Sequence, residues 1–270
     1  MAIRRWIGAA FGVVALSPLA MAHDFWMELA DYRVQPGEAV AVSLFVGHDA
    51  EVKPYPRKPS HVDWFRVEGE GARRAIEGHA GMDPAGRFTL ERSGVFAIGY
   101  RSTRTFIELE ASKFESYLAH EGLDPIIAER ARRGETEVPG REVYSRCAKA
   151  FVRVGADPAE AKDYERSLGM PLEFIPMSDP TRVSAGGRLG LRLLHRDTPL
   201  AGARVDAMHW PLAGEMPVTR IGVTDAEGRV WFELSHAGEW VIASTHMTDA
   251  PPEVDADWES LWAALTIEIE

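Results

Sequence analysis

The chain has 270 residues, with 41 acidic against 30 basic residues and a formal net charge of −11 at pH 7. Such an acidic chain is unsuited to binding nucleic acid or an anionic membrane surface. Its single cysteine excludes an internal disulfide, so packing must hold the fold together.

The first 22 residues have the three-part pattern of a secretory signal peptide. Arg4 and Arg5 precede an uncharged apolar run, and Ala20-Met21-Ala22 fits the small-x-small rule for cleavage. The run is too short to span a bilayer as a stable helix. Cleavage after this motif predicts a periplasmic protein that begins with His23. Loss of the two arginines changes the net charge from −11 to −13. An anchor that is never cut is the alternative interpretation.

Short strand patterns separated by turns dominate the first half of the mature chain. In residues 39–46, Val40, Val42, Leu44 and Val46 share one parity, as expected of a strand. Closely spaced patterns of this kind favour an all-β sheet. Further strands are expected at residues 62–67, 87–90, 95–101, 105–109 and 141–154. Cys147 lies in the last of these, where a packed thiol is expected rather than a nucleophile.

One helical segment interrupts the β pattern at residues 112–133. Ser112 and Glu115 have the spacing of a capping box, and Gly122 supplies a stop signal. Asp124-Pro125 then opens a second helix, which ends at the next glycine. The two helices are predicted to form an insertion in a β domain rather than a separate domain.

A charged, proline-containing segment at residues 155–168 is predicted to be a linker and to mark a domain boundary. Beyond it the strand patterns resume, and residues 221–240 are predicted to be a hairpin whose Gly228 adopts a positive φ. The expected fold is mainly β, with two β-sandwich-like domains. The first domain spans residues 23–155 and holds the helical insertion, and the second spans residues 156–270.

His23 is the first candidate metal ligand, because a mature chain that starts with it offers an α-amine and an imidazole on one residue. Ni(II), Cu(II), Co(II) and Zn(II) suit such nitrogen donors. The amine must lose its proton to bind, so affinity should fall in mild acid. The alternative is that His23 binds nothing. Phe25 occupies the third mature position, which excludes the square-planar amino-terminal nickel motif.

His246 is the expected second ligand, and His48 is the third candidate. His246 lies near the end of a predicted strand and shares the parity of Trp240 and Ile242, so it should point toward a sheet face. His48 follows another predicted strand. A strand-end histidine bonded to backbone or water is the alternative interpretation of His246.

Sequence signatures of catalysis are missing, so no catalytic residue is predicted. The chain has no His-Glu-x-x-His pair, phosphate-binding loop, dinucleotide fingerprint or Gly-x-Ser-x-Gly elbow. A glycosidase-like carboxylate pair stays open, because sequence does not give the separation that such chemistry requires.

Several short motifs together resemble a known family. They are His23-Asp24-Phe25-Trp26, Lys113 to Leu118 with Glu121-Gly122-Leu123, Tyr144 to Ala150, Pro171-Leu172-Glu173 with Asp179-Pro180, Pro199 to Ala203, Thr224-Asp225 with Gly228, His246-Met247, and Asp257 to Ser260. Their order and spacing resemble the domain-of-unknown-function family labelled as the periplasmic component of nickel or cobalt uptake. The second half also resembles the carboxypeptidase-regulatory-like or transthyretin-like β-sandwiches.

The resemblance implies a periplasmic protein, not an enzyme, that binds a nickel or cobalt ion, with copper as an alternative. Its expected partner is an inner-membrane metal transporter, without nucleic acid and without membrane insertion after cleavage. Two other classes stay open: a copper enzyme with an amino-terminal histidine brace, and a scaffold or adhesion module outside the cytoplasm. Metal titration would separate the scaffold from the first two classes, and oxygen-dependent reduction would separate those two from each other.

Overall fold

The computed structural model describes residues 24–48, 51–156, 163–209 and 217–270. The predicted signal peptide and His23 lie outside these residues, as does the middle of the predicted linker, at residues 157–162. The described fold is mainly β and sandwich-like, as the sequence predicts.

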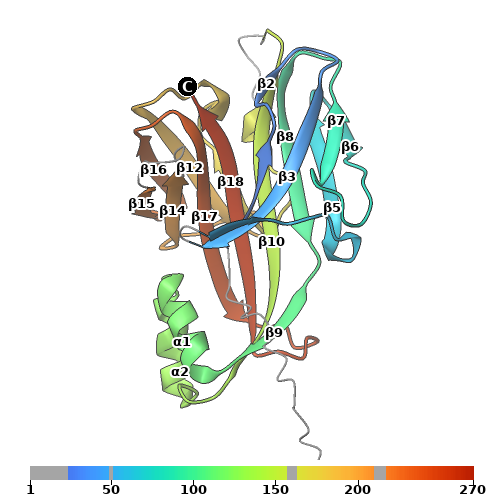
Figure 1. The fold of residues 1–270 in the computed structure, drawn as a ribbon. Helices are drawn as coiled ribbons and strands as arrows, with labels where there is room; N and C mark the ends of the chain where they lie inside the picture. Colours follow the sequence, from blue (N-terminus) through green and yellow to red (C-terminus); the bar gives the residue numbers. More distant parts are fainter. Residues whose placement is uncertain (1–23, 49–50, 157–162, 210–216) are drawn as a thin grey trace, which may run out of the picture.

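Three long strands run through the middle of a ten-stranded sheet of the described chain (Figure 1). They are β10 (Gly140–Val154), β17 (Gly238–Asp249) and β18 (Trp258–Ile269). β10 and β18 are parallel, whereas β17 and β18 are antiparallel. The other strands of this long sheet are β2 (Arg33–Val34), β5 (Val62–Gly69), β6 (Ala72–Ala75), β8 (Gly94–Ser102), β9 (Thr105–Leu109), β14 (Arg204–His209) and β15 (Val218–Val223).

This long sheet crosses the domain boundary that the sequence predicts near residue 155. β10 belongs to the first half of the chain and β18 is its last strand, yet the two pair from Glu142↔Trp258 to Ala150↔Thr266. A parallel pair needs a long connection, and here that connection is the whole second half of the chain. The long sheet thus contains strands from both halves of the chain, and the division into two domains stays a prediction.

A small sheet covers part of the first face of the long sheet, which is the face that carries Cys147, Phe151 and Leu265. Its strands are β11 (Leu172–Pro176), β12 (Gly187–His195), β13 (Thr198–Pro199) and β16 (Arg229–Leu234). The two layers bury an apolar core that includes Leu191 and Trp240. Cys147 is buried in this core, as expected from the sequence.

The second face of the long sheet carries the alternate residues, such as Val152 and Trp262, and is covered at both ends. A sheet of β1 (Asp24–Leu29), β3 (Ala39–His48), β4 (Glu51–Pro54) and β7 (Gly86–Thr89) packs Phe25 and Met27 against one end. The helices α1 (Ala111–His120) and α2 (Asp124–Arg133) cover the other end. Figure 1 shows this helical pair beside the ends of β17 and β18.

The helices occupy the predicted insertion, and the glycine stops are confirmed. Gly122 and Gly134 have φ of 69° and 72°, the left-handed conformation that glycine adopts at low cost. Short 3₁₀ turns complete the described helices: η1 (Pro59–His61), η2 (Asp163–Glu165) and η3 (Pro180–Arg182). None of the helices in the described ranges has the length and apolar character of a membrane-spanning segment.

The predicted capping box is wrong. The N-cap of α1 is Glu110, which makes no side-chain cap, and Ser112 lies inside the helix. Glu115 instead accepts a hydrogen bond of 2.7 Å from Nε of Arg130, a fully buried arginine of α2. Burying a guanidinium without a carboxylate partner is costly. Glu115 therefore pairs with Arg130 instead of capping the start of α1.

The predicted hairpin at residues 221–240 is also wrong, although its turn is present. β15 pairs with β14 in the long sheet, whereas β16 pairs with β12 in the small sheet. The turn between them closes with a 2.9 Å bond from the Gly228 amide to the Asp225 carbonyl, and Gly228 has the predicted positive φ, at 72°. The turn therefore passes the chain from one layer of the sandwich to the other.

Candidate functional site

A small pocket lies on the second face of the long sheet, between the start of β1 and the end of α1. Three carboxyl residues line it: Asp24 of β1, Glu121 after α1 and Asp206 of β14. The rest of the lining is His120, Arg204, Ala243, Ser244 and Thr245. Its volume of about 20 Å³ is the size that one water or one small ion requires. We call it the amino-terminal pocket, because Asp24 directly follows His23 in the chain.

Regular elements from four parts of the chain hold this pocket in place. Asp24 is fixed by its pairing with Gly47 at the edge of β1 and β3. Thr245 of β17 donates a hydrogen bond of 2.8 Å to a carboxylate oxygen of Glu121. Glu121 is itself the C-cap of α1. The carbonyl end of a helix repels negative charge, so a carboxylate is disfavoured there and a cation is favoured.

The pocket has an excess of negative charge, which contributes to a raised pKa of the Glu121 carboxyl. The pKa of the Glu121 carboxyl is raised to about 8, mainly by burial and also by the charges of Asp24 and Asp206, while the Thr245 hydrogen bond and Arg204 oppose the shift. At pH 7 this carboxyl is therefore mostly protonated. A cation placed beside it would favour the ionised carboxylate and so offset the effect of burial.

The arginine of the pocket is already engaged. Arg204 donates from Nε and from its terminal nitrogen Nη2 to the two oxygens of Asp206, at 2.9 and 2.8 Å. Its other terminal nitrogen, Nη1, donates to the carbonyl of His120 at 2.9 Å. Such a bidentate pair neutralises Asp206. Within the described chain, Glu121 forms no ion pair, so its charge would be uncompensated.

His48 and His246 are the two predicted metal ligands that fall within the described residues. β3 ends at His48, one position beyond Gly47, which pairs with Asp24. The backbone of His48 therefore lies next to the start of β1, at the amino-terminal end of the described chain. His23 is outside the described residues but is joined covalently to Asp24.

His246 lies on the opposite face of the long sheet. Its ring packs against that of His195 in β12, with centroids 4.5 Å apart and an angle of 60° between the planes. Its neighbour Thr245 points into the amino-terminal pocket, and side chains alternate along a strand, so His246 points away from that pocket. The structure does not bring His246 together with Asp24, although the predicted parity with Trp240 and Ile242 is confirmed.

The His246 ring is neutral at pH 7. Its pKa is lowered to about 4, mainly by burial and also by the neighbouring His195 and the positive charge of Arg196. Burial likewise lowers the pKa of His195, whose Nε2 is buried without a hydrogen-bond partner. Two neutral imidazoles meet here, one from each layer of the sandwich.

Glu121 and Asp206 were not predicted from the sequence to be members of a site. Glu121 belongs to the Glu121-Gly122-Leu123 motif of the family resemblance, and that was the available signal. No sequence signal pointed to Asp206, because its position depends on the register of β14 against β17. Within residues 24–48, 51–156, 163–209 and 217–270, no group of three or more His, Cys, Asp or Glu side chains is arranged to hold a metal ion.

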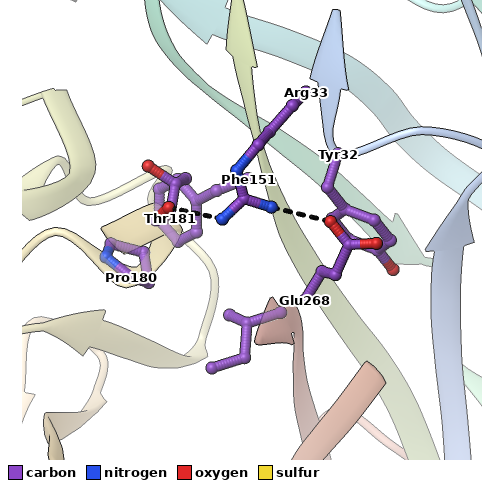
Figure 2. A pocket seen from close by; sticks show the side chains of 7 residues that line it. Tyr32, Arg33, Phe151, Pro180, Thr181 and Glu268 are labelled. Atoms are coloured by element: carbon purple, nitrogen blue, oxygen red, sulfur yellow. Dashed lines mark hydrogen bonds and ion pairs between the residues drawn. The ribbon is translucent and has the colours of Figure 1, made fainter. Parts of the chain in front are cut away.

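A second small pocket is a structural junction rather than a binding site. Figure 2 shows the Arg33 guanidinium between Thr181 and Glu268, close to Tyr32 and Phe151. Arg33 donates to the Glu268 carboxylate at 2.7 Å and to the Thr181 carbonyl at 2.8 Å. With a volume of about 10 Å³, this pocket has room for about one water.

The fold and the amino-terminal pocket define a mainly β, sandwich-like protein with an acidic pocket at the start of its first described strand. The family model "Domain of unknown function (DUF4198)" matches residues 20–248, and the chain belongs to this family. No curated protein matches the chain.

Two solved structures show a distant likeness. One is a tetra-tandem repeat in the extending region of a large adhesion protein, with 9% identity and a TM-score of 0.24, over 92% of this chain and 50% of that chain. The other is Salmonella alpha-2-macroglobulin reacted with methylamine, with 8% identity and a TM-score of 0.21, over 90% of this chain and 14% of that chain. The chain thus spans half or less of each, and at these scores the likeness carries no argument about function.

Proposed function

We propose that this protein binds a divalent transition-metal ion, nickel or cobalt, at the amino-terminal pocket, and that it does so in the periplasm. In this proposal it assists the passage of the ion to an inner-membrane transporter. One observation supports it above all: the Glu121 carboxyl is buried beside Asp24, the residue that follows the predicted mature amino terminus. His23 would add an amine and an imidazole to these oxygens.

The electrostatics of the pocket support a cation. A bound divalent ion would ionise Glu121, whose pKa of about 8 is raised by burial and by Asp24. The α-amine of His23, with a reference pKa of about 7.7–8.0, must also lose its proton to bind. Metal binding would therefore release protons from both groups, and affinity should rise from pH 6 to pH 9.

The donor set suits nickel and cobalt but requires His23. Imidazole and amine nitrogens favour these ions, and carboxylate oxygens complete a mixed site. The described side chains alone do not form a three-ligand group. The native amino terminus is therefore decisive, and a form with extra residues before His23 should not bind well.

Calorimetric titration with nickel and cobalt tests the proposal on protein with its native amino terminus. One variant has a glycine inserted before His23, which keeps the imidazole and moves the amine off that residue. A second is Glu121→Gln, and its matched control is Glu137→Gln, an exposed carboxylate in the turn after α2. Insertion and Glu121→Gln should each weaken binding about tenfold or more, and Glu137→Gln should leave it unchanged.

Two outcomes would contradict this site. Full affinity of the inserted form would exclude the amine as a ligand, and full affinity of Glu121→Gln would exclude the pocket. His246→Ala tests the pairing predicted from sequence: because His246 lies on the other face, this variant should retain its affinity. Copper-dependent oxygen reduction by the native form would instead favour the histidine-brace enzyme.

A further inference from the structure

An open cleft of about 740 Å³ lies on the first face of the long sheet, where the small sheet ends. Met170 and Pro171, which precede β11, form one side, and Leu261 of β18 lies in the wall. Its volume falls within the usual range for small-molecule sites. This cleft is separate from the amino-terminal pocket, which is on the second face.

A carboxylate and two arginines form the most organised part of the cleft wall. Glu259 of β18 is only 4% exposed, and it accepts bonds on both of its oxygens. Arg104 donates from Nε to one oxygen at 2.8 Å, and Arg196 donates from its terminal nitrogen Nη2 to the other at 2.8 Å. The side chains of Arg104 and Arg196 are 49% and 57% exposed, so further N–H donors of both guanidiniums face solvent.

The turn that presents Arg196 is held in an uncommon conformation. Arg196 and Asp197 link β12 to β13, and their φ angles are 49° and 63°. Two consecutive positive φ values are typical of hairpin turns that normally contain Asn and Gly. Larger side chains disfavour this region, and such strain persists where the surrounding structure fixes it, often at functional sites. Here the Arg196 amide bonds to the Pro171 carbonyl at 2.9 Å, and both turn residues line the cleft.

The charges of the lining do not balance locally. One carboxylate, Glu259, is shared by two arginines, which leaves one guanidinium charge uncompensated. Arg101 pairs with Asp63 at 3.3 Å. Asp197 and Glu253 also line the cleft, and neither forms an ion pair within the described residues. The wall thus offers N–H donors for an anionic group and, for a cationic one, two carboxylates that form no ion pair within the described residues.

We propose that this cleft binds a small zwitterion with a free carboxylate and a free ammonium group, namely an amino acid or a short peptide. The exposed donors of Arg104 and Arg196, held in position by Glu259, bind the carboxylate, because guanidinium groups match carboxylate geometry. Asp197 and Glu253 attract the ammonium group. A phosphate or a polyanion fits this lining less well, because the acidic side chains repel it.

Trialanine is the probe for this proposal, with the mature protein kept metal-free in chelator so that the metal site plays no part. Arginine Nε–Hε resonances in ¹H–¹⁵N spectra report directly on the guanidiniums. Millimolar trialanine should shift the signals of Arg104 and Arg196, whereas its carboxy-amide should not. N-acetyl-trialanine should bind several-fold more weakly, because it lacks the ammonium group.

Matched variants separate the site from general effects. Arg196→Gln should weaken trialanine binding at least tenfold. Arg192→Gln, at an exposed position of β12, the strand that precedes the Arg196 turn, should leave it unchanged. Glu253→Gln, in the exposed loop before β18, should weaken trialanine but not its N-acetyl form. Absence of arginine shifts, equal binding of the amide, or equal binding of inorganic phosphate would each overturn the proposal.

Discussion

Replacing Glu121 by glutamine should stabilise the protein at neutral pH but not at pH 5. The folded-state pKa of this carboxyl is about 8, against 4.5 when it is free of the fold, and burial is the main cause. Because the folded state holds its proton more tightly, this group destabilises the fold progressively as pH rises from 4.5 to 8. At 1.36 kcal/mol per pH unit, the cost is about 3 kcal/mol at pH 7 and about 5 kcal/mol above pH 8. Glutamine has no charge, keeps the shape and still accepts the Thr245 hydrogen bond, so it avoids this cost.

Thermal melts of metal-free wild type and Glu121→Gln at pH 5 and pH 7 measure the effect. For a chain of this size, 3 kcal/mol corresponds to a rise in Tm of roughly 6–12 °C at pH 7. At pH 5 the difference should fall below about 1 kcal/mol, because the cost accumulates only above the unfolded-state pKa of 4.5 and pH 5 is half a unit above that value. Glu137→Gln, which is exposed, is the control and should melt like wild type at both values. An equal Tm difference at both pH values would refute the assignment of a raised pKa to Glu121.

Three other predictions concern the core, a turn and the metal. Lys149 and Glu173 form a buried ion pair at 2.7 Å, with side chains 2% and 1% exposed, so Lys149→Met should lower the free energy of unfolding by about 3–5 kcal/mol in urea titrations. Gly228→Val should cost roughly 1–3 kcal/mol, because φ is 72° and an added Cβ would lie 2.8 Å from the Leu193 carbonyl oxygen; an unchanged Tm would show that this contact relaxes freely. Nickel affinity should increase from pH 6 to pH 9, as Glu121 and the amine of His23 lose their protons; a flat calorimetric profile would contradict the proposed ligands.

Local elements of this fold were predictable because each has a local physical cause. Strand residues alternate between faces, so periodicity identified β3 and β10. Gly122 ends α1 in a left-handed conformation that other residues rarely adopt, and this made the stop visible in the sequence. The partner of β10 was not predictable, because β18 lies more than a hundred residues away and nothing local specifies their pairing.

The amino-terminal pocket likewise depends on segments that are distant in sequence. The parity of His246 was predicted correctly, but parity does not say which face of the sheet meets the start of β1. Thr245 and His246 differ by one residue, and in a strand that single step exchanges the two faces. Glu121 acquires its raised pKa from burial and from the charge of Asp24, while the Thr245 hydrogen bond opposes the shift, and both residues are distant from Glu121 in sequence. Its role could therefore be recognised only after the three segments had been placed together.

The amino-terminal pocket is lined by β17 and the cleft by the neighbouring strand β18, on opposite faces of the long sheet, and this geometry predicts that the two proposed sites act independently. On β17, Thr245 points into the amino-terminal pocket, while His246 contacts His195 beside the turn of Arg196. The β17–β18 ladder is paired without interruption from Gly238↔Ile269 to Asp249↔Trp258. Coupling requires an element with two arrangements that both ligands bias, and a continuous ladder offers only one register. Saturating nickel should therefore change the calorimetric Kd for trialanine by less than about twofold, whereas a change of tenfold, or 1.4 kcal/mol, would show that the strands move between two states.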